Sequence, residues 1–332
     1  MAGQIWAVNS LGGFYYSLNL SKDLRMGVEA MSKFRQFCDI RDAWGKVTRA
    51  GQTFTWDTVP MMARASRALT ETNTMPQGQH TVLQATLTMN ERGFSVPYSE
   101  FLESMSQFTV RQPIMKVLKY DAAVDLDCLA HQQFNNTPLR VSATATGDAV
   151  TLTTNSSATL TASAGISSTN LKSIIDTMKG RNIPRYENGD YYAISRPLAA
   201  RNVKNSLETL LQYTESGIAK VMNGEYGRFP EGLRMIEQTT IPIGGATDST
   251  TFDAFADTGD AWNSGSGTTG DWVFVFGEDT VCEAIHTPVE MRAKIPDDYG
   301  RSKGVAWYWL GGVGITHTNV VQARILKFDS AV

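Results

Sequence analysis

The sequence lacks several features that common protein functions require. Its 332 residues include three cysteines, Cys38, Cys128 and Cys282, which lie far apart and match no metal-binding or redox spacing. Lysine and arginine number 30 against 33 aspartate and glutamate residues, so the basic excess typical of phosphate-binding surfaces is missing. No run of ~18 apolar residues predicts a membrane span, and no basic stretch precedes an apolar segment at the N-terminus. We therefore expect reduced thiols, no membrane contact and no strong binding of nucleic acid.

Nucleotide-binding and nucleophile motifs are missing as well. There is no Walker-type glycine-lysine loop and no Gly-x-Ser-x-Gly elbow. The nearest approach to a dinucleotide fingerprint begins at Gly312-Val313-Gly314, but it has no third glycine and no helical pattern after it. We interpret it as strand sequence and expect no cofactor.

One group of side chains could support catalysis. Asp121 and Asp125, and likewise Asp127 and His131, are four residues apart in a predicted helix, so each pair shares a helix face. Converging carboxylates and imidazoles serve acid/base or metal chemistry, but a single helix supplies at most part of a metal's ligands. We favour a solvated acidic face with no catalytic residue and no metal. A metal-dependent or acid/base hydrolase that uses these residues is the alternative.

Two segments with strand periodicity predict a long antiparallel ribbon. Residues 51–58 place Phe54 and Trp56 on one face, and residues 82–89 alternate in the same way. The tip between them carries Arg64 and Arg67, which would suit acidic groups on a partner surface. An isolated two-stranded ribbon is marginally stable in water, so this one needs a docking surface on its own body or on a partner.

Three helices are predicted from apolar spacing. The first runs from about Gln112 to Phe134 with Pro113 in its first turn, and its apolar stripe includes Val117. The second spans Leu171–Lys179 with Thr169 or Asn170 as its cap. The third starts at Pro197 and stops at Asn223-Gly224.

The remaining sequence predicts strands, an insert and an arm. Together with the helices, these elements predict an α+β fold whose final strands return late in the chain. The expected elements are an extended arm over residues 1–50 that contains Trp6, a small exposed β-excursion within 139–168, a strand at Tyr191–Ser195, a surface insert at Gly244–Gly270, a central strand at Trp272–Phe276, and C-terminal strands around Val305, Trp307 and Trp309 and around Val321, Ala323 and Ile325.

The stretch Asn182–Glu237 carries short motifs in a characteristic order. They are Ile183-Pro184, a strand-to-helix step from Tyr191 to Pro197, Asn223-Gly224-Glu225-Tyr226-Gly227, and Gly232-Leu233-Arg234-Met235-Ile236-Glu237; Phe276-Gly277 then precedes an expected helical step at Thr280–Ile285. This pattern resembles the major capsid proteins of tailed bacteriophages that have the Hong Kong ninety-seven fold. It is most similar to the podophage-type branch of that family.

The resemblance implies a division of the chain into five parts. They are an N-terminal arm at 1–50, an extended β-hairpin loop at 51–95, a peripheral domain at 96–170 with a spine helix at about 112–135, an axial domain at 171–290 with an exposed insert at 244–270, and C-terminal strands at 291–332 that return to the peripheral domain.

The resemblance also implies a function. Copies of the chain would assemble into hexamers and pentamers of an icosahedral head that encloses double-stranded DNA, with a portal at one vertex. Assembly would take place in the host bacterial cytoplasm and the product would reside in the virion. A separate scaffolding protein and a decoration protein are further partners that the resemblance allows, and a decoration or tail component is a further alternative for the chain itself. The expected inter-subunit contact residues are Trp6, Phe54, Trp56, Arg64 and Arg67.

Overall fold

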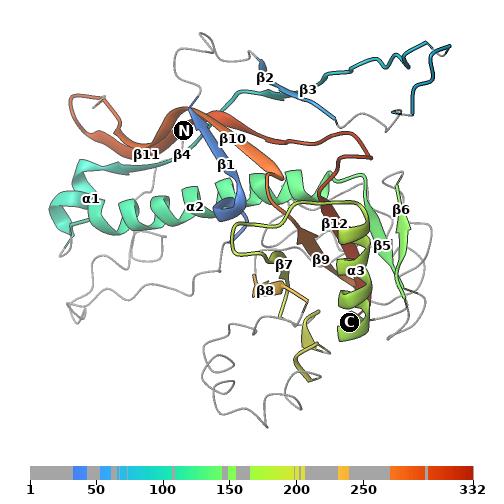
Figure 1. The fold of residues 1–332 in the computed structure, drawn as a ribbon. Coiled ribbons are helices and arrows are strands. Elements are labelled where there is room, and N and C mark those ends of the chain that lie inside the picture. The colour runs from blue at the N-terminus through green and yellow to red at the C-terminus, as the bar shows by residue number, and fades with distance from the viewer. Residues whose placement is uncertain are drawn as a thin grey trace.

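The fold is α+β, as predicted, with three sheets and few helices (Figure 1). A computed structural model describes residues 33–42, 53–60, 66, 68–72, 74–106, 109–143, 149–154, 165–197, 199–201, 203–205, 231–238, 270–295 and 298–331. None of the helices in this part of the chain combines the length and the apolarity that a membrane span requires.

A four-stranded sheet forms the long side of the molecule (Figure 1). Its order is β1 (Asp39–Asp42), β10 (Val281–Ala293), β11 (Ser302–Ile315) and β4 (Asn90–Ser99). The helical step predicted at Thr280–Ile285 is therefore wrong. Val281 to Ile285 pair with β11 on one side, and Cys282 to Ile285 pair with β1 on the other, and pairing on both edges outweighs the helical preference of so short a window.

A six-stranded sheet forms the second body of the fold. Its order is β6 (Thr151–Thr153), β5 (Arg140–Ser142), β12 (Ile325–Ala331), β9 (Gly270–Phe276), β7 (Tyr191–Ser195) and β8 (Leu233–Glu237). β9 is an interior strand, as its continuous apolar sequence predicts, and Trp272 to Phe276 are all buried. The late return of the chain is confirmed too, because β12 pairs with β5 and β9.

The long helix α2 (Arg111–Asn135) connects the two sheets, and its bounds match the prediction within one residue (Figure 1). Its N-terminal half packs Leu118 and neighbouring apolar residues against the Trp307 and Trp309 side of β11. Its C-terminal half packs Phe134 against the six-stranded sheet. Val117, which we placed on the buried stripe, is 51% exposed, because the helix is covered along a narrower face than the sequence pattern indicated.

The helix α3 (Ser168–Gly180) covers the opposite face of the six-stranded sheet. Alternate residues of β9 point to opposite faces, so Phe274 contacts the α2 side while Val273 and Val275 contact the α3 side. The helix cap is Ser167, not Thr169 or Asn170, and a capping box with Asn170 completes the first turn.

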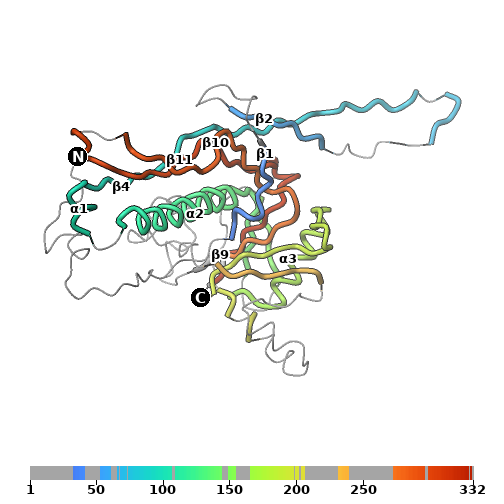
Figure 2. Tube along the Cα trace, turned by 90° about the vertical axis from the view of Figure 1, so that its left-hand side faces the viewer, coloured from blue at the N-terminus to red at the C-terminus, as the bar shows by residue number. Residues whose placement is uncertain are grey.

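The predicted ribbon is present. β2 (Thr53–Thr58) pairs antiparallel with β3 (Leu83–Thr88), and the chain between these strands extends away from the body (Figure 2). After β3 the chain enters β4 at Asn90, so the loop boundary expected at residue 95 falls inside a strand of the four-stranded sheet. The short helix α1 (Glu100–Met105) follows, with Ser99 as its cap.

Several expectations are corrected or lie outside the described residues. The strands of the predicted β-excursion exist as β5 and β6, but β5 is buried rather than exposed because it pairs with β12. Val321 is 78% exposed and precedes β12, so the last strand starts later than predicted. The helix predicted after Pro197 is described only at its start, with helical residues at 201 and 203–205; most of the arm, the rest of that helix and the insert at 244–269 lie outside the described residues. The five-part division of the chain stays a prediction.

Candidate functional site

The four side chains of the alternative hydrolase site do not converge. Asp121 Oδ2 accepts a hydrogen bond from the indole Nε1 of Trp307 at 2.8 Å, and Asp125 Oδ1 accepts one from Arg92 at 2.9 Å. Burial raises the pKa of Asp125, and Arg92 opposes that shift. Both carboxylates therefore fasten α2 to neighbouring strands of the four-stranded sheet.

Asp127 and His131 lie toward the other end of α2 and have structural partners. Asp127 accepts hydrogen bonds from the backbone N–H of Lys33 and of Arg35, and from the side chain of Gln238. His131 is 3% exposed between aromatic rings, with Phe34 at a centroid distance of 5.0 Å. Burial lowers the pKa of His131 to about 3, so its imidazole is neutral near pH 7 and is a poor proton acceptor.

Nothing at these positions supports the hydrolase alternative, because the three carboxylates hold α2 to other segments and the imidazole is buried among aromatic rings. Within the described residues, no group of three or more His, Cys, Asp and Glu side chains could hold a metal ion. The three cysteines are free thiols, as predicted. Burial raises the pKa of Cys282 to about 11 and that of Cys128 to about 12, so both thiols are protonated and weakly nucleophilic near pH 7.

The ribbon is the most distinctive surface feature, and its root is attached to its own body. Leu87 and Met89 are buried against Ala284 of β10, and Phe54 and Trp56 pack on the edge of this cluster. The indole Nε1 of Trp56 donates a hydrogen bond to the backbone oxygen of Thr316 at 3.2 Å. This contact supplies part of the docking surface that the sequence required for a ribbon of this length.

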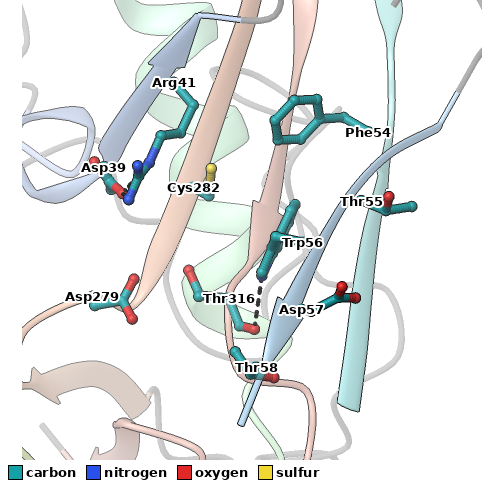
Figure 3. Close-up of a pocket in the computed structure, with 10 residues that line it drawn as sticks. All are labelled: Asp39, Arg41, Phe54, Thr55, Trp56, Asp57, Thr58, Asp279, Cys282 and Thr316. Carbon is teal, nitrogen blue, oxygen red and sulfur yellow. Dashed lines mark hydrogen bonds and ion pairs between the residues drawn. The ribbon is translucent and has the colours of Figure 1, made fainter. Parts of the chain in front are cut away.

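A groove of about 580 Å³ lies beside the root, between β1, β2 and β10 (Figure 3). Figure 3 shows the indole of Trp56 directed at Thr316 on one wall and Asp39 with Arg41 on the opposite wall. Asp39 forms an ion pair with Arg41, and Asp279 lies 3.4 Å from Arg324, while Asp57 accepts a hydrogen bond from the neutral amide of Gln84. The described residues that line the groove include no histidine and no arrangement of an activated nucleophile with a base.

Beyond its root, the ribbon exposes apolar side chains. Val59 is 63% exposed and Met75 is 68% exposed, and Leu69 and Val82 are also largely accessible. These four residues lie in the segment that connects β2 to β3, where none of the described residues belongs to a strand, and they gain little burial within their own chain. They are available to another molecule.

The residues predicted for inter-subunit contact fall into two groups. Phe54 and Trp56 lie on β2, half-buried at the ribbon root, with Trp56 bound to the body of its own chain. Trp6, Arg64 and Arg67 lie outside the described residues, so their positions stay predictions.

Gly312 and Gly314 have a role that their sequence did not predict. The pair lies in β11 directly beneath Leu87 of the ribbon. Glycines two residues apart share one face of a strand, and a strand face without side chains admits a close backbone approach. The spacing of two residues was the feature of the sequence from which a close backbone approach could have been predicted.

The fold is shared with solved structures of phage capsids over nearly the whole chain. No protein-family model and no curated protein matches the sequence. The capsid of cyanophage Pam1 is 14% identical with a TM-score of 0.65, covering 97% of this chain and 98% of that one. The capsid of Ralstonia phage GP4 is 12% identical with a TM-score of 0.64, covering 98% of both chains. The acid-stable capsid of Helicobacter pylori bacteriophage KHP30 is 11% identical with a TM-score of 0.65, covering 96% of both. Because the sequence identities are this low, the comparison shows a shared fold and nothing more. Phage capsid proteins are also the proteins that the sequence motifs resemble.

Proposed function

We propose that this chain is the major capsid protein of a tailed bacteriophage and forms an icosahedral shell from copies of itself. The observation that carries the proposal is the likeness of fold to phage capsids along almost the entire length of both chains. We further propose the podophage-type branch, on the motifs between Asn182 and Glu237.

The ribbon is our candidate for the element that contacts a neighbouring copy. It projects from the body and carries exposed apolar side chains, among them Val59 and Met75 (Figure 2). Obligate interfaces commonly bury about 2,000 Å² or more, and a subunit that contacts several neighbours needs such projecting elements. Trp6, Phe54, Trp56, Arg64 and Arg67 are the proposed contact residues.

The further partners follow from the same proposal. Packaged double-stranded DNA would touch the shell without sequence-specific contact, because the chain has a net charge of -3 and no basic excess. A portal at one vertex, a separate scaffolding protein and a decoration protein complete the proposed partners. We place assembly in the host bacterial cytoplasm and the product in the virion.

The direct test is to express the full chain, alone and with candidate scaffolding proteins from the same genome, and to examine it by size-exclusion chromatography and negative-stain microscopy. We expect megadalton particles with hexameric and pentameric clusters. A monodisperse 36.4 kDa monomer under all these conditions would contradict the proposal. Rings or tubes of a single symmetry, without closed shells, would indicate a tail or decoration component instead.

A further inference from the structure

The ribbon crosses the four-stranded sheet where that sheet has no side chains. β4 pairs with β11 only as far as Asn90, which lies opposite Gly311. The residues before it, Leu87 and Thr88, leave the edge of the sheet and pass over the face of β11 at Gly312 and Gly314. The chain therefore changes there from pairing beside β11 to crossing over it.

The crossing is closer than any side chain would allow. A Cβ atom added to Gly312 would lie 2.4 Å from Leu87 Cδ1 and 2.6 Å from the backbone oxygen of Thr88. A Cβ atom on Gly314 would lie 2.9 Å from Leu87 Cβ and 3.3 Å from Trp56 Cη2. Because one of these obstacles is backbone, a methyl group could be accommodated only by moving the main chain of the ribbon.

The same position is secured from both strands of the ribbon. Leu87 of β3 is 4% exposed and fills the space over the two glycines, so apolar burial holds one strand down. Trp56 of β2 lies over Gly314, and its hydrogen bond to Thr316 fixes the second strand. Two attachments on two strands define an orientation, whereas one would leave the ribbon free to swing.

We propose that Gly312 and Gly314 form a glycine seat, the pair of positioning residues that sets the direction in which the ribbon leaves the body before any neighbour is bound. The geometry of the seat rests on the contacts of Leu87 and Trp56 described above. Its effect on particle assembly rests on the proposed shell function. A strand rises ~3.3 Å per residue, so a small change of angle at the seat moves the far end of the ribbon by several times the displacement at its root. An element already held in its binding direction also loses less conformational freedom on association.

The test compares three alanine variants of the full chain. Gly312→Ala adds a methyl group in the seat. Gly304→Ala is the matched control on the same strand, because its Cβ would meet neighbours only at ordinary contact distances of 3.4–3.5 Å. Gly180→Ala adds a Cβ with nothing within 4 Å. Hydrogen exchange in residues 53–58 and 83–88 reports the seat directly, and microscopy reports assembly.

We expect Gly312→Ala to keep the folded core while exchange in both ribbon strands rises roughly tenfold or more, with loss of closed particles. Gly304→Ala and Gly180→Ala should match the unmodified chain in both measurements. Unchanged ribbon exchange in Gly312→Ala would overturn the seat.

A second variant keeps the proposal testable if Gly312→Ala fails to fold. Trp56→Phe keeps an aromatic ring at the ribbon root but removes both the hydrogen bond to Thr316 and the indole Cη2 over Gly314, so exchange should rise more in β2 than in β3. Equal, unchanged exchange in both strands would contradict the two-point attachment. If the unmodified chain forms no particles, the shell function fails, but the exchange measurements still decide whether the seat exists.

Discussion

At the scale of single residues, the polar groups buried along α2 hold separate segments together. Asp127 binds the backbone of residues 33–35 and the side chain of Gln238, so one carboxylate joins three distant segments. His131, one turn further on, stays neutral among aromatic rings and beside Lys327, whose ammonium lies 3.6 Å from the centre of the Trp272 ring. Burial makes each of these groups sensitive to a change in its charge.

The buried imidazole predicts a pH dependence of stability. The folded-state pKa of His131 is about 3 and that of an unfolded histidine is about 6.5, so between these values the unfolded chain binds the extra proton. The free energy of unfolding should therefore fall as pH is lowered, by ~2 kcal/mol from pH 7 to pH 5 through this residue. Denaturant unfolding at both pH values should show the loss in the unmodified chain, and His131→Phe should show a loss smaller by that amount. An equal pH dependence in both proteins would contradict the assignment.

At the scale of elements, the segment that contains Phe34 and β1 binds to parts of the chain that are distant from it in sequence. Phe34 is fully buried against α2 and β9, and Arg35 makes a two-point ion pair with Glu283, which is 1% exposed. β1 then adds a parallel strand to β10. The sequence predicts an extended arm over these residues, and their burial comes from contacts with both sheets.

Replacing Arg35 by alanine should weaken this attachment. The substitution leaves the buried carboxylate of Glu283 without its ion-pair partner, and because Arg35 is itself 34% exposed we expect a loss of ~2–3 kcal/mol in the free energy of unfolding. Arg41→Ala is the matched control, because Arg41 is 64% exposed in its pair with Asp39 and should change stability by less than ~0.5 kcal/mol. Adding Glu283→Gln to Arg35→Ala should recover part of the loss; similar effects of both arginine variants would contradict the buried pair.

Periodic segments were predictable, and long-range contacts were not. The ribbon, α2 and β9 show their period or apolar run over enough residues to identify them. The step at Thr280–Ile285 failed because its strand identity comes from two partners that are distant in sequence. The role of Gly312 and Gly314 could not be predicted for the same reason. Leu87, which is distant in sequence, lies directly over both residues and leaves no room for a side chain there.

At the scale of the whole molecule, α2 joins two sheets into one body from which the ribbon projects (Figures 1 and 2). Packing on both faces of the six-stranded sheet gives that body its rigidity, because α2 and α3 cover β9 from opposite sides. A shell subunit needs this division, since a firm body defines the angles at which projecting elements meet their neighbours.

The ribbon tip should be required for assembly but not for folding. Arg64→Glu with Arg67→Glu reverses two charges that we propose to meet acidic groups of a neighbour, so we expect loss of closed particles with an unchanged unfolding transition. Arg64→Lys with Arg67→Lys preserves the charge and should retain assembly. Normal shells from the charge-reversed chain, seen by negative-stain microscopy, would contradict the docking role of the tip.

The interior of the six-stranded sheet should be the most sensitive part of the body. Phe328 on β12 is fully buried in the cluster between the six-stranded sheet and α3, and Phe328→Ala should lower the free energy of unfolding by ~3–5 kcal/mol. Val321→Ala, at a position that is 78% exposed just before this strand, should change it by less than ~0.5 kcal/mol. Thermal denaturation of both variants makes the comparison, and a small effect at Phe328 would be incompatible with a well-packed interior at that position.

The position of β12 has a consequence for the order of folding. β12 follows β5 and β9 in sequence but lies between them in the sheet, so the two halves of that sheet stay apart until residues 325–331 have docked. Contacts between segments so distant in sequence form slowly, because the loop between them must first be closed. We therefore expect the six-stranded sheet to close late, as a single step that joins β6 and β5 to β9, β7 and β8.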